Sequence, residues 1–115
     1  MATTEQVAER FHAALTAADA DGLRGGVLAD EVTFEGPVAT ASGVAECVAG
    51  LVEMGKMISG DQVEVRLADD GNVLTWSTVR AGGGPGRPTV TWLRVDGERI
   101  TAIRTVFDAR GTGGH

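Results

Sequence analysis

The fold is decided by residues 63–80, which read VEVRLADDGNVLTWSTVR. Apolar and polar side chains alternate over residues 63–67, which is the period of a β-strand, and a strand-rich run begins again at residue 73. Between the two runs, Asp69-Asp70-Gly71-Asn72 supplies turn-forming residues. We therefore predict two antiparallel strands, the second spanning residues 73–81, joined by a tight turn.

Two further strands are predicted toward the C-terminus, over residues 88–95 and 100–108. Asp96-Gly97-Glu98 joins them as a tight hairpin, and the last five residues, 111–115, have nothing to pack and are expected to form a flexible tail. The glycine-rich segment 82–87 has strands on both sides, whereas a phosphate-binding loop leads from a strand into a helix. We interpret it as a mobile hairpin loop rather than a nucleotide site.

The N-terminal half has the period of helices. Thr3 and Gln6 have the spacing of a capping box, which marks the start of a helix of about fifteen residues. Its apolar stripe is formed by Val7, Phe11, Ala14, Leu15 and Ala18.

A short second helix is predicted over residues 23–29, weakened by two internal glycines, and a strand over residues 32–35. Ser42 is predicted to be the N-cap of a third helix, and Gly60 is predicted to close it. The order of helix, short helix, strand and helix, followed by four antiparallel strands, describes an α+β domain whose helices cover one face of a sheet.

Composition limits the organisation and the partners. The chain has 115 residues, 43% of them hydrophobic, so we expect one domain over residues 1–110. Ten Lys and Arg against sixteen Asp and Glu give a net charge of −6, which disfavours nucleic acid and anionic membranes as partners. Cys47 is the only cysteine, and the first residues lack the pattern of a signal peptide, so we expect a cytoplasmic protein.

Neither face of the predicted strands is plainly polar. One face carries Val73, Thr75, Ser77, Val79, Thr91, Leu93, Ile103, Thr105 and Phe107. An antiparallel sheet with only one buried face alternates more cleanly, so the second face is expected to be covered by another copy of the chain. The residues predicted for this homodimer interface are Trp76, Trp92, Arg94, Arg104 and Val106.

Several strings of the sequence, at residues 10–15, 18–23, 28–37 and 95–108, resemble the nuclear transport factor 2-like superfamily. The resemblance is to its small bacterial SnoaL-like and ketosteroid isomerase-like domains, and it covers about residues 4–110. It implies a cone in which three N-terminal helices pack on a curved, mainly antiparallel sheet and enclose an apolar cavity. It also implies a small apolar or polyketide-like ligand and, frequently, a dimer through the sheet.

The catalytic positions of two related enzyme groups do not carry over. The resemblance places the tyrosine, the base and the acid of ketosteroid isomerases at Phe11, at Gly36 and near Thr91, and none of these can do that chemistry. The acids and arginine of limonene-type epoxide hydrolases would fall at about Ser77, Val79 and Thr105. Epoxide opening is therefore the disfavoured alternative.

His12 is the candidate acid or base, because it lies one residue past Phe11 of the apolar stripe and imidazole exchanges protons near neutral pH.

No metal or other cofactor is expected, since one cysteine and two histidines cannot close a tetrahedral metal site. Cys47 is interpreted as a core thiol. The residues predicted to line the ligand cavity are Phe11, Leu15, Phe34, Met54, Ser77, Thr91, Ile103, Thr105 and Phe107.

Two function classes remain open from the sequence. The first is an isomerase or cyclase that moves a proton on a small apolar substrate. The second is a non-catalytic binding or assembly domain that acts through the Trp76 and Trp92 face.

Arg104 and Asp108, four residues apart on the last strand, are interpreted as a surface or interface ion pair.

Overall fold

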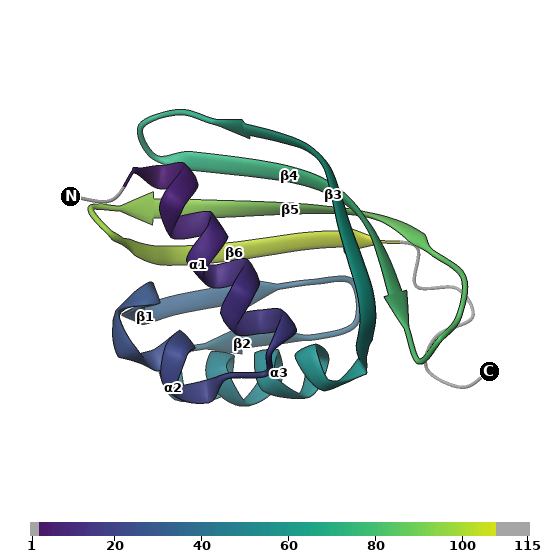
Figure 1. The fold of residues 1–115 in the computed structure, drawn as a ribbon. Helices are drawn as coiled ribbons and strands as arrows, with labels where there is room; N and C mark the ends of the chain where they lie inside the picture. The colour runs from purple at the N-terminus through teal and green to yellow at the C-terminus, as the bar shows by residue number, and fades with distance from the viewer. Residues whose placement is uncertain (1–2, 108–115) are drawn as a thin grey trace.

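The computed structural model describes residues 3–107 (Figure 1). Three helical segments and six strands follow one another along this part of the chain. The helical segments are α1 (Thr4–Thr16), α2 (Ala20–Gly22), which continues into a π-helical turn at Leu23–Val27, and α3 (Val44–Met57). The strands are β1 (Leu28–Glu35), β2 (Thr40–Ser42), β3 (Ile58–Ala68), β4 (Asn72–Ala81), β5 (Arg87–Asp96) and β6 (Arg99–Phe107).

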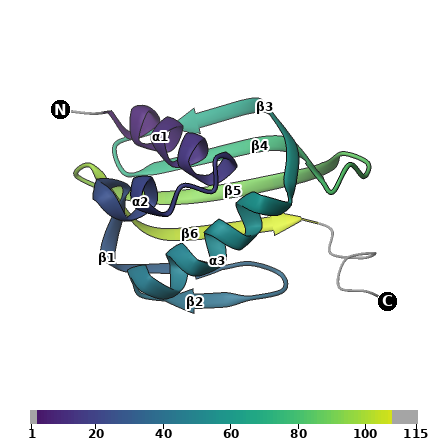
Figure 2. The same ribbon diagram turned by 60° about the horizontal axis from the view of Figure 1, so that its bottom comes forward.

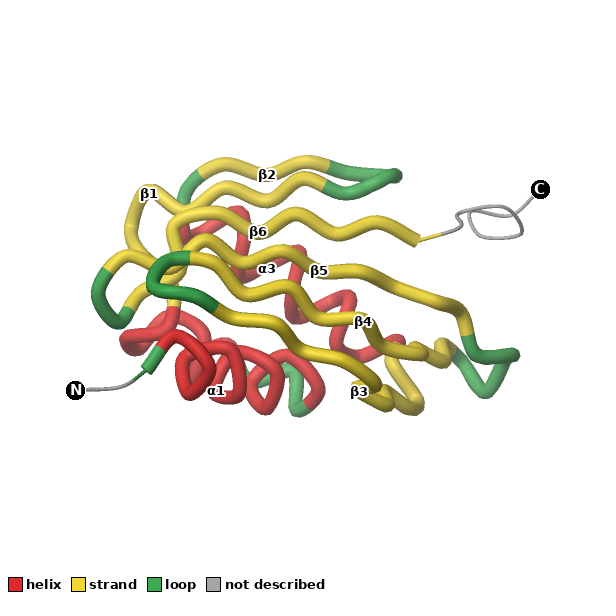
Figure 3. Tube along the Cα trace, turned by 90° about the horizontal axis from the view of Figure 1, so that it is seen from above, coloured by secondary structure: helices red, strands yellow, loops and turns green. Residues whose placement is uncertain are grey.

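The strands form one sheet in the order β2-β1-β6-β5-β4-β3. All neighbours are antiparallel except β1 and β6, which pair in parallel. The helices lie together on one face of the sheet, as the two rotated views make clear (Figures 2 and 3). We call this the helix-covered face and the opposite one the outer face. The predicted α+β class, with three helices packed on a curved, mainly antiparallel sheet, is confirmed.

Helix α1 begins where the capping box predicted. The Gln6 amide donates to the Thr3 hydroxyl at 3.1 Å, and the Thr3 amide donates to the Gln6 side-chain oxygen at 2.9 Å. Both bonds satisfy amides that the first helical turn leaves without partners. The buried face of α1 is formed by Val7, Ala8, Phe11 and Ala14.

The predicted ends of the third helix are wrong. Ser42 belongs to β2, and the N-cap is Gly43, whose φ of 86° is a conformation that favours glycine. At the other end α3 stops at Met57, because Ile58 already has extended backbone angles, and Gly60 lies inside β3. The third strand is therefore longer than its alternating residues alone indicated.

The second helical segment also differs from the prediction of residues 23–29. The π-helical turn ends at Val27, and inside it Gly26 has a φ of 129°, which no right-handed helix can continue. Strand β1 consequently starts at Leu28 rather than at residue 32, and the short strand β2 was not predicted. Asp108 and the predicted tail 111–115 lie outside the described residues.

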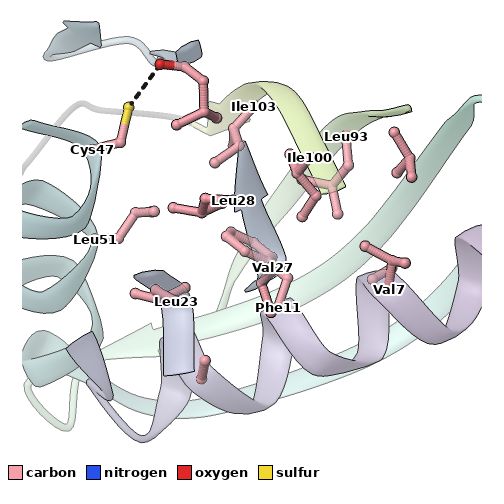
Figure 4. Packing of buried hydrophobic residues seen from close by; sticks show 14 of the residues in the cluster. Val7, Phe11, Leu23, Val27, Leu28, Cys47, Leu51, Leu93, Ile100 and Ile103 are labelled. Atoms are coloured by element: carbon pink, nitrogen blue, oxygen red, sulfur yellow. Dashed lines mark hydrogen bonds between the residues drawn. The ribbon is translucent and has the colours of Figure 1, made fainter. Parts of the chain in front are cut away.

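The core lies between the helices and the sheet (Figure 4). Val7 and Leu23 on the helical side and Ile100 on β6 are all fully buried. Cys47 is buried in the same layer, and its thiol donates to the Val32 carbonyl oxygen at 3.5 Å. Burial, followed by the negative charge of Glu46, raises the pKa of the Cys47 thiol above 9.0.

Helices α1 and α3 touch at a glycine. A Cβ atom on Gly55 would lie 2.0 Å from the carbonyl oxygen of Leu15 and 3.3 Å from the Cα atom of Ala18. Only a residue without a side chain permits this approach. Gly55 therefore sets the spacing of the two helices beside Leu15 and Met54.

Across residues 3–107, no helix has the length and hydrophobicity that crossing a membrane requires.

Candidate functional site

A cavity of about 640 Å³ lies between α1, the end of α3 and the helix-covered face of strands β3 to β6. This volume is within the usual range for small-molecule sites. The loops after β1 and β4 complete the wall. Its lining residues are Ala8, Phe11, His12, Leu15, Val38, Met54, Met57, Ile58, Asp61, Arg66, Thr75, Ser77, Val79, Ala81, Gly84, Pro85, Arg87, Thr89, Thr91, Leu93, Thr105 and Phe107.

Most residues predicted for the cavity wall lie there, namely Phe11, Leu15, Met54, Ser77, Thr91, Thr105 and Phe107, and so does His12. Phe34 and Ile103 do not line it. Ile103 faces the core and is only 1% exposed, and it lies in one row of the sheet with Leu93 and the fully buried Val73. Phe34 is partly buried and packs against that core, and its ring lies close to Gly36.

His12 faces a carboxylate that the sequence analysis did not single out. Its Nδ1 atom lies 3.5 Å from Oδ2 of Asp61, whose side chain is only 8% exposed. The second oxygen, Oδ1, is buried and has no hydrogen-bond partner among the described residues. An acid and an imidazole thus meet at the wall of an otherwise mainly apolar cavity.

A row of hydroxyl groups crosses the cavity floor. Thr75 on β4, Thr91 on β5 and Thr105 on β6 are opposite one another in the sheet. The hydroxyl oxygens of Thr91 and Thr105 are 3.3 Å apart, and Nε of Arg66 on β3 donates to the Thr75 hydroxyl at 3.2 Å. The row therefore ends at a guanidinium group.

Two irregularities in the pairing of β3 with β4 direct Asp61 and Arg66 to this side. The register shifts between Ile58 and Gly60 and again between Val63 and Val65. A bulge changes which residues point to each face of a strand. As a result, Arg66 lies opposite Thr75 and lines the cavity, whereas the apolar neighbours on either side of it, Val65 and Leu67, are 51% and 64% exposed.

Only a weak signal for these charged residues is present in the sequence. Asp61 lies in a segment predicted to lie at the end of a helix, and Arg66 is a polar position in an alternating strand that would ordinarily face solvent. Asp61 and Arg66 are five residues apart, and an odd spacing in a regular strand places two side chains on opposite faces. Only the register shifts bring both to the same side of the sheet.

Within residues 3–107, no cluster of three or more His, Cys, Asp or Glu side chains could hold a metal ion.

The outer face carries the residues predicted for an interface. Trp76 is 50% exposed and Val106 is 67% exposed. The guanidinium of Arg104 stacks on the Trp92 ring at 5.2 Å, and its Nε atom lies 3.1 Å from Glu35. Arg104 thus has Glu35 as a partner, whereas the predicted partner Asp108 lies outside the described residues. Arg94 is exposed on the same face.

The curved sheet with its helix-covered cavity defines a class of proteins, the nuclear transport factor 2-like fold. An NTF2-like protein from Cytophaga hutchinsonii shares it at a TM-score of 0.81 and 19% identity, over 96% of this chain and 95% of that one. The model of the SnoaL-like domain matches residues 8–103, and the chain belongs to this family. No curated protein matches the sequence.

Two other solved structures are similar and have names that indicate enzymes. An LEH-like epoxide hydrolase from M. tuberculosis has a TM-score of 0.75 and 26% identity, over 93% of this chain and 85% of that one. A putative polyketide cyclase from Sinorhizobium meliloti has a TM-score of 0.76 and 18% identity, over 86% and 92%. The fold is common to these proteins, but the names of the two enzymes indicate different activities, so the function has to be argued from the residues in the cavity.

Proposed function

We propose that this SnoaL-like domain binds a small, mainly apolar molecule in the cavity and transfers a proton on it, as an isomerase or cyclase does. The observation that carries the proposal is the contact between His12 and the buried carboxylate of Asp61. An imidazole positioned at the wall of a mainly apolar cavity can take a proton from a carbon atom of a molecule bound there.

The geometry gives each group a role. With its proton on Nδ1, His12 is oriented by the Asp61 carboxylate and keeps Nε2 as the proton acceptor. A proton taken from a carbon beside a carbonyl group leaves an enolate, and the imidazolium then returns the proton to another atom of the same molecule. The reaction is redox-neutral and requires no group beyond the two side chains and the substrate.

Epoxide opening by a limonene-type arrangement is supported less well. By the resemblance, the charged residues of that arrangement would fall at about Ser77, Val79 and Thr105, which line the cavity and carry no charge. Among the described lining residues, Asp61 is the only carboxylate. A mechanism that uses one carboxylate to activate water and another to protonate the epoxide lacks its second acid.

The test uses 5-nitrobenzisoxazole, a chromogenic probe of proton abstraction from carbon. A base removes its C3 proton, the N–O bond breaks, and the coloured 2-cyano-4-nitrophenolate forms. The protein is expected to accelerate this reaction above the rate with equal concentrations of free imidazole and acetate. His12→Ala and Asp61→Asn should each lower the rate at least tenfold. A positioned base contributes about 100-fold or more, so a tenfold loss is the smallest that fits this role.

Gln62→Ala is the matched control, because Gln62 is adjacent to Asp61 but exposed and outside the cavity wall. It should react like the unmodified protein. Circular dichroism of each variant checks that the fold is retained. Equal rates for the unmodified protein and His12→Ala would refute the assignment of His12, and no acceleration by any form would refute the proton-transfer proposal.

A second proposal concerns assembly, and the outer face supports it. We propose that two copies of the chain pack through this face. Two adjacent rows of side chains cross it, each in register from strand to strand. One row contains Val65, Trp76, Val90 and Val106, and the other contains Leu67, Leu74, Trp92 and Arg104.

The exposure of these rows favours a partner. Leu67, Leu74 and Trp76 are between 44% and 64% exposed, and contiguous apolar surface of this kind is typical of interaction sites. A two-fold pair would place the same patch of both copies together, and the one charged residue of the two rows, Arg104, is already paired with Glu35.

Sedimentation equilibrium measures the mass. A dimer of twice 11.9 kDa is expected for the unmodified chain, and Trp76→Glu should give a monomer. Ala49→Glu adds the same charge on the exposed side of α3 and should leave the dimer intact. A monomeric unmodified protein, or a Trp76→Glu variant that stays dimeric, would refute the interface.

A further inference from the structure

Arg66 carries a positive charge that no acid of the described residues balances. It is half-buried and lines the cavity, and none of their carboxylates lies within 4.0 Å of its guanidinium nitrogens. Its hydrogen bond goes instead to a neutral hydroxyl, that of Thr75. A partly desolvated cation without a counter-charge attracts an anion.

The hydroxyl groups beside Arg66 are oriented to donate. A guanidinium only donates hydrogen bonds, so the Thr75 oxygen is the acceptor and its own proton stays available. In the Thr91 and Thr105 pair, one hydroxyl donates to the other, which leaves one proton for a further acceptor. The floor of the cavity thus presents donors next to a positive charge.

The acid in the cavity is too distant to neutralise Arg66. Asp61 lies opposite Val79, which is four residues along β4 from Thr75. Four strand residues span roughly 13 Å. Arg66 therefore keeps its positive charge at the cavity wall, although the chain as a whole carries a net charge of −6.

We propose that Arg66 and the threonine row form a carboxylate-binding subsite. The ligand is then an elongated molecule with an apolar body and one carboxylate, which pairs with Arg66 and accepts hydrogen bonds from Thr75 and the Thr91–Thr105 pair. The body of the ligand extends along Phe11 and Leu15 toward His12 and Asp61. The subsite rests on the proposed function, because it names the class of molecule that the same cavity binds.

The test compares two probes of similar shape, 2-naphthoate and the neutral ketone 2-acetylnaphthalene, by calorimetry at pH 7.5. The unmodified protein should bind the carboxylate at least tenfold more tightly, which is the ratio expected for one hydrogen bond to a charged group. Arg66→Met should abolish this preference and leave the affinity for the ketone within threefold. Thr75→Val, which keeps the side-chain shape, should reduce the preference as well.

Arg80→Met is the matched control, because Arg80 is an exposed arginine of β4 whose removal changes the net charge equally. It should keep the preference for 2-naphthoate. Equal affinities for the two probes would overturn the carboxylate subsite while supporting the cavity proposal. A preference that survives both Arg66→Met and Thr75→Val, or that is lost in Arg80→Met, would overturn the assignment to Arg66. Binding of neither probe would overturn both proposals.

Discussion

Replacing Gly55 by alanine should destabilise the protein, although alanine is the better helix former. The added Cβ atom would lie 2.0 Å from the Leu15 carbonyl oxygen, which is 1.4 Å closer than an ordinary contact of 3.4 Å. The obstacle is backbone, so it cannot rotate away as a side chain would. Helices α1 and α3 must move apart, or the carbonyl of Leu15 must tilt and weaken its bond from the Ala18 amide.

The expected size follows from two opposing effects. Overpacking a tight interior costs about 1–3 kcal/mol, and contact with backbone places this substitution near the upper value. Alanine returns about 1 kcal/mol of helix propensity relative to glycine. We therefore expect Gly55→Ala to lower the free energy of unfolding by about 2 kcal/mol.

Gly50→Ala is the control within the same helix. Gly50 is exposed, and a Cβ atom there meets nothing within 4 Å, so only the propensity gain of about 1 kcal/mol applies. Urea denaturation followed by circular dichroism should separate the two variants by about 3 kcal/mol, with opposite signs. If both substitutions stabilise the protein, the close approach of α1 and α3 is not a constraint and the reasoning fails.

Three further predictions concern stability. Thr3→Ala removes the capping box of α1 and should cost about 1 kcal/mol in urea denaturation, whereas an unchanged midpoint would contradict the cap. Ala18→Gly should gain about 0.5 kcal/mol in the same assay, because a φ of 52° is costly for alanine, and a loss would contradict this. For Cys47, burial and the charge of Glu46 raise the folded-state pKa, so the unfolded chain releases the thiol proton first as pH rises through 9.0. Stability should therefore fall above that pH, and Cys47→Ala, measured from pH 7 to 10.5, should show a smaller decline.

Local signals in the sequence predicted the elements that local physics controls. The capping box of Thr3 and Gln6 defined α1, and the alternating residues together with the turn at Asp69 defined the hairpin of β3 and β4. The predicted ends of α3 failed because glycine is ambiguous. A positive φ made Gly43 the entry to the helix, whereas Gly60 sits in a strand where no sequence signal distinguishes it from a helix stop.

The candidate site was predictable only in part. Phe11 follows from its place in the apolar stripe of α1, His12 from its place next to that stripe, and the inward threonines from strand alternation. Asp61 and Arg66 could not be assigned, because two register shifts in β3 decide which face each one occupies. Ile103 was misplaced since strand alternation gives its face but not where, along that face, packed core ends and open cavity begins.

The parallel pairing of β1 with β6 sets the order in which the molecule can be completed as it is synthesised. Strands β1 and β2 leave the ribosome early, but β6 lies between them and the rest of the sheet. Until residues 99–107 emerge, β1 has an edge with unpaired amides and carbonyls, and its apolar residues lack Ile100 and Ile103. Such an open edge invites pairing with other chains. Within residues 3–107, the last strand made is thus the one that joins the two halves of the sheet, and a nascent chain without it exposes an edge at which it can aggregate.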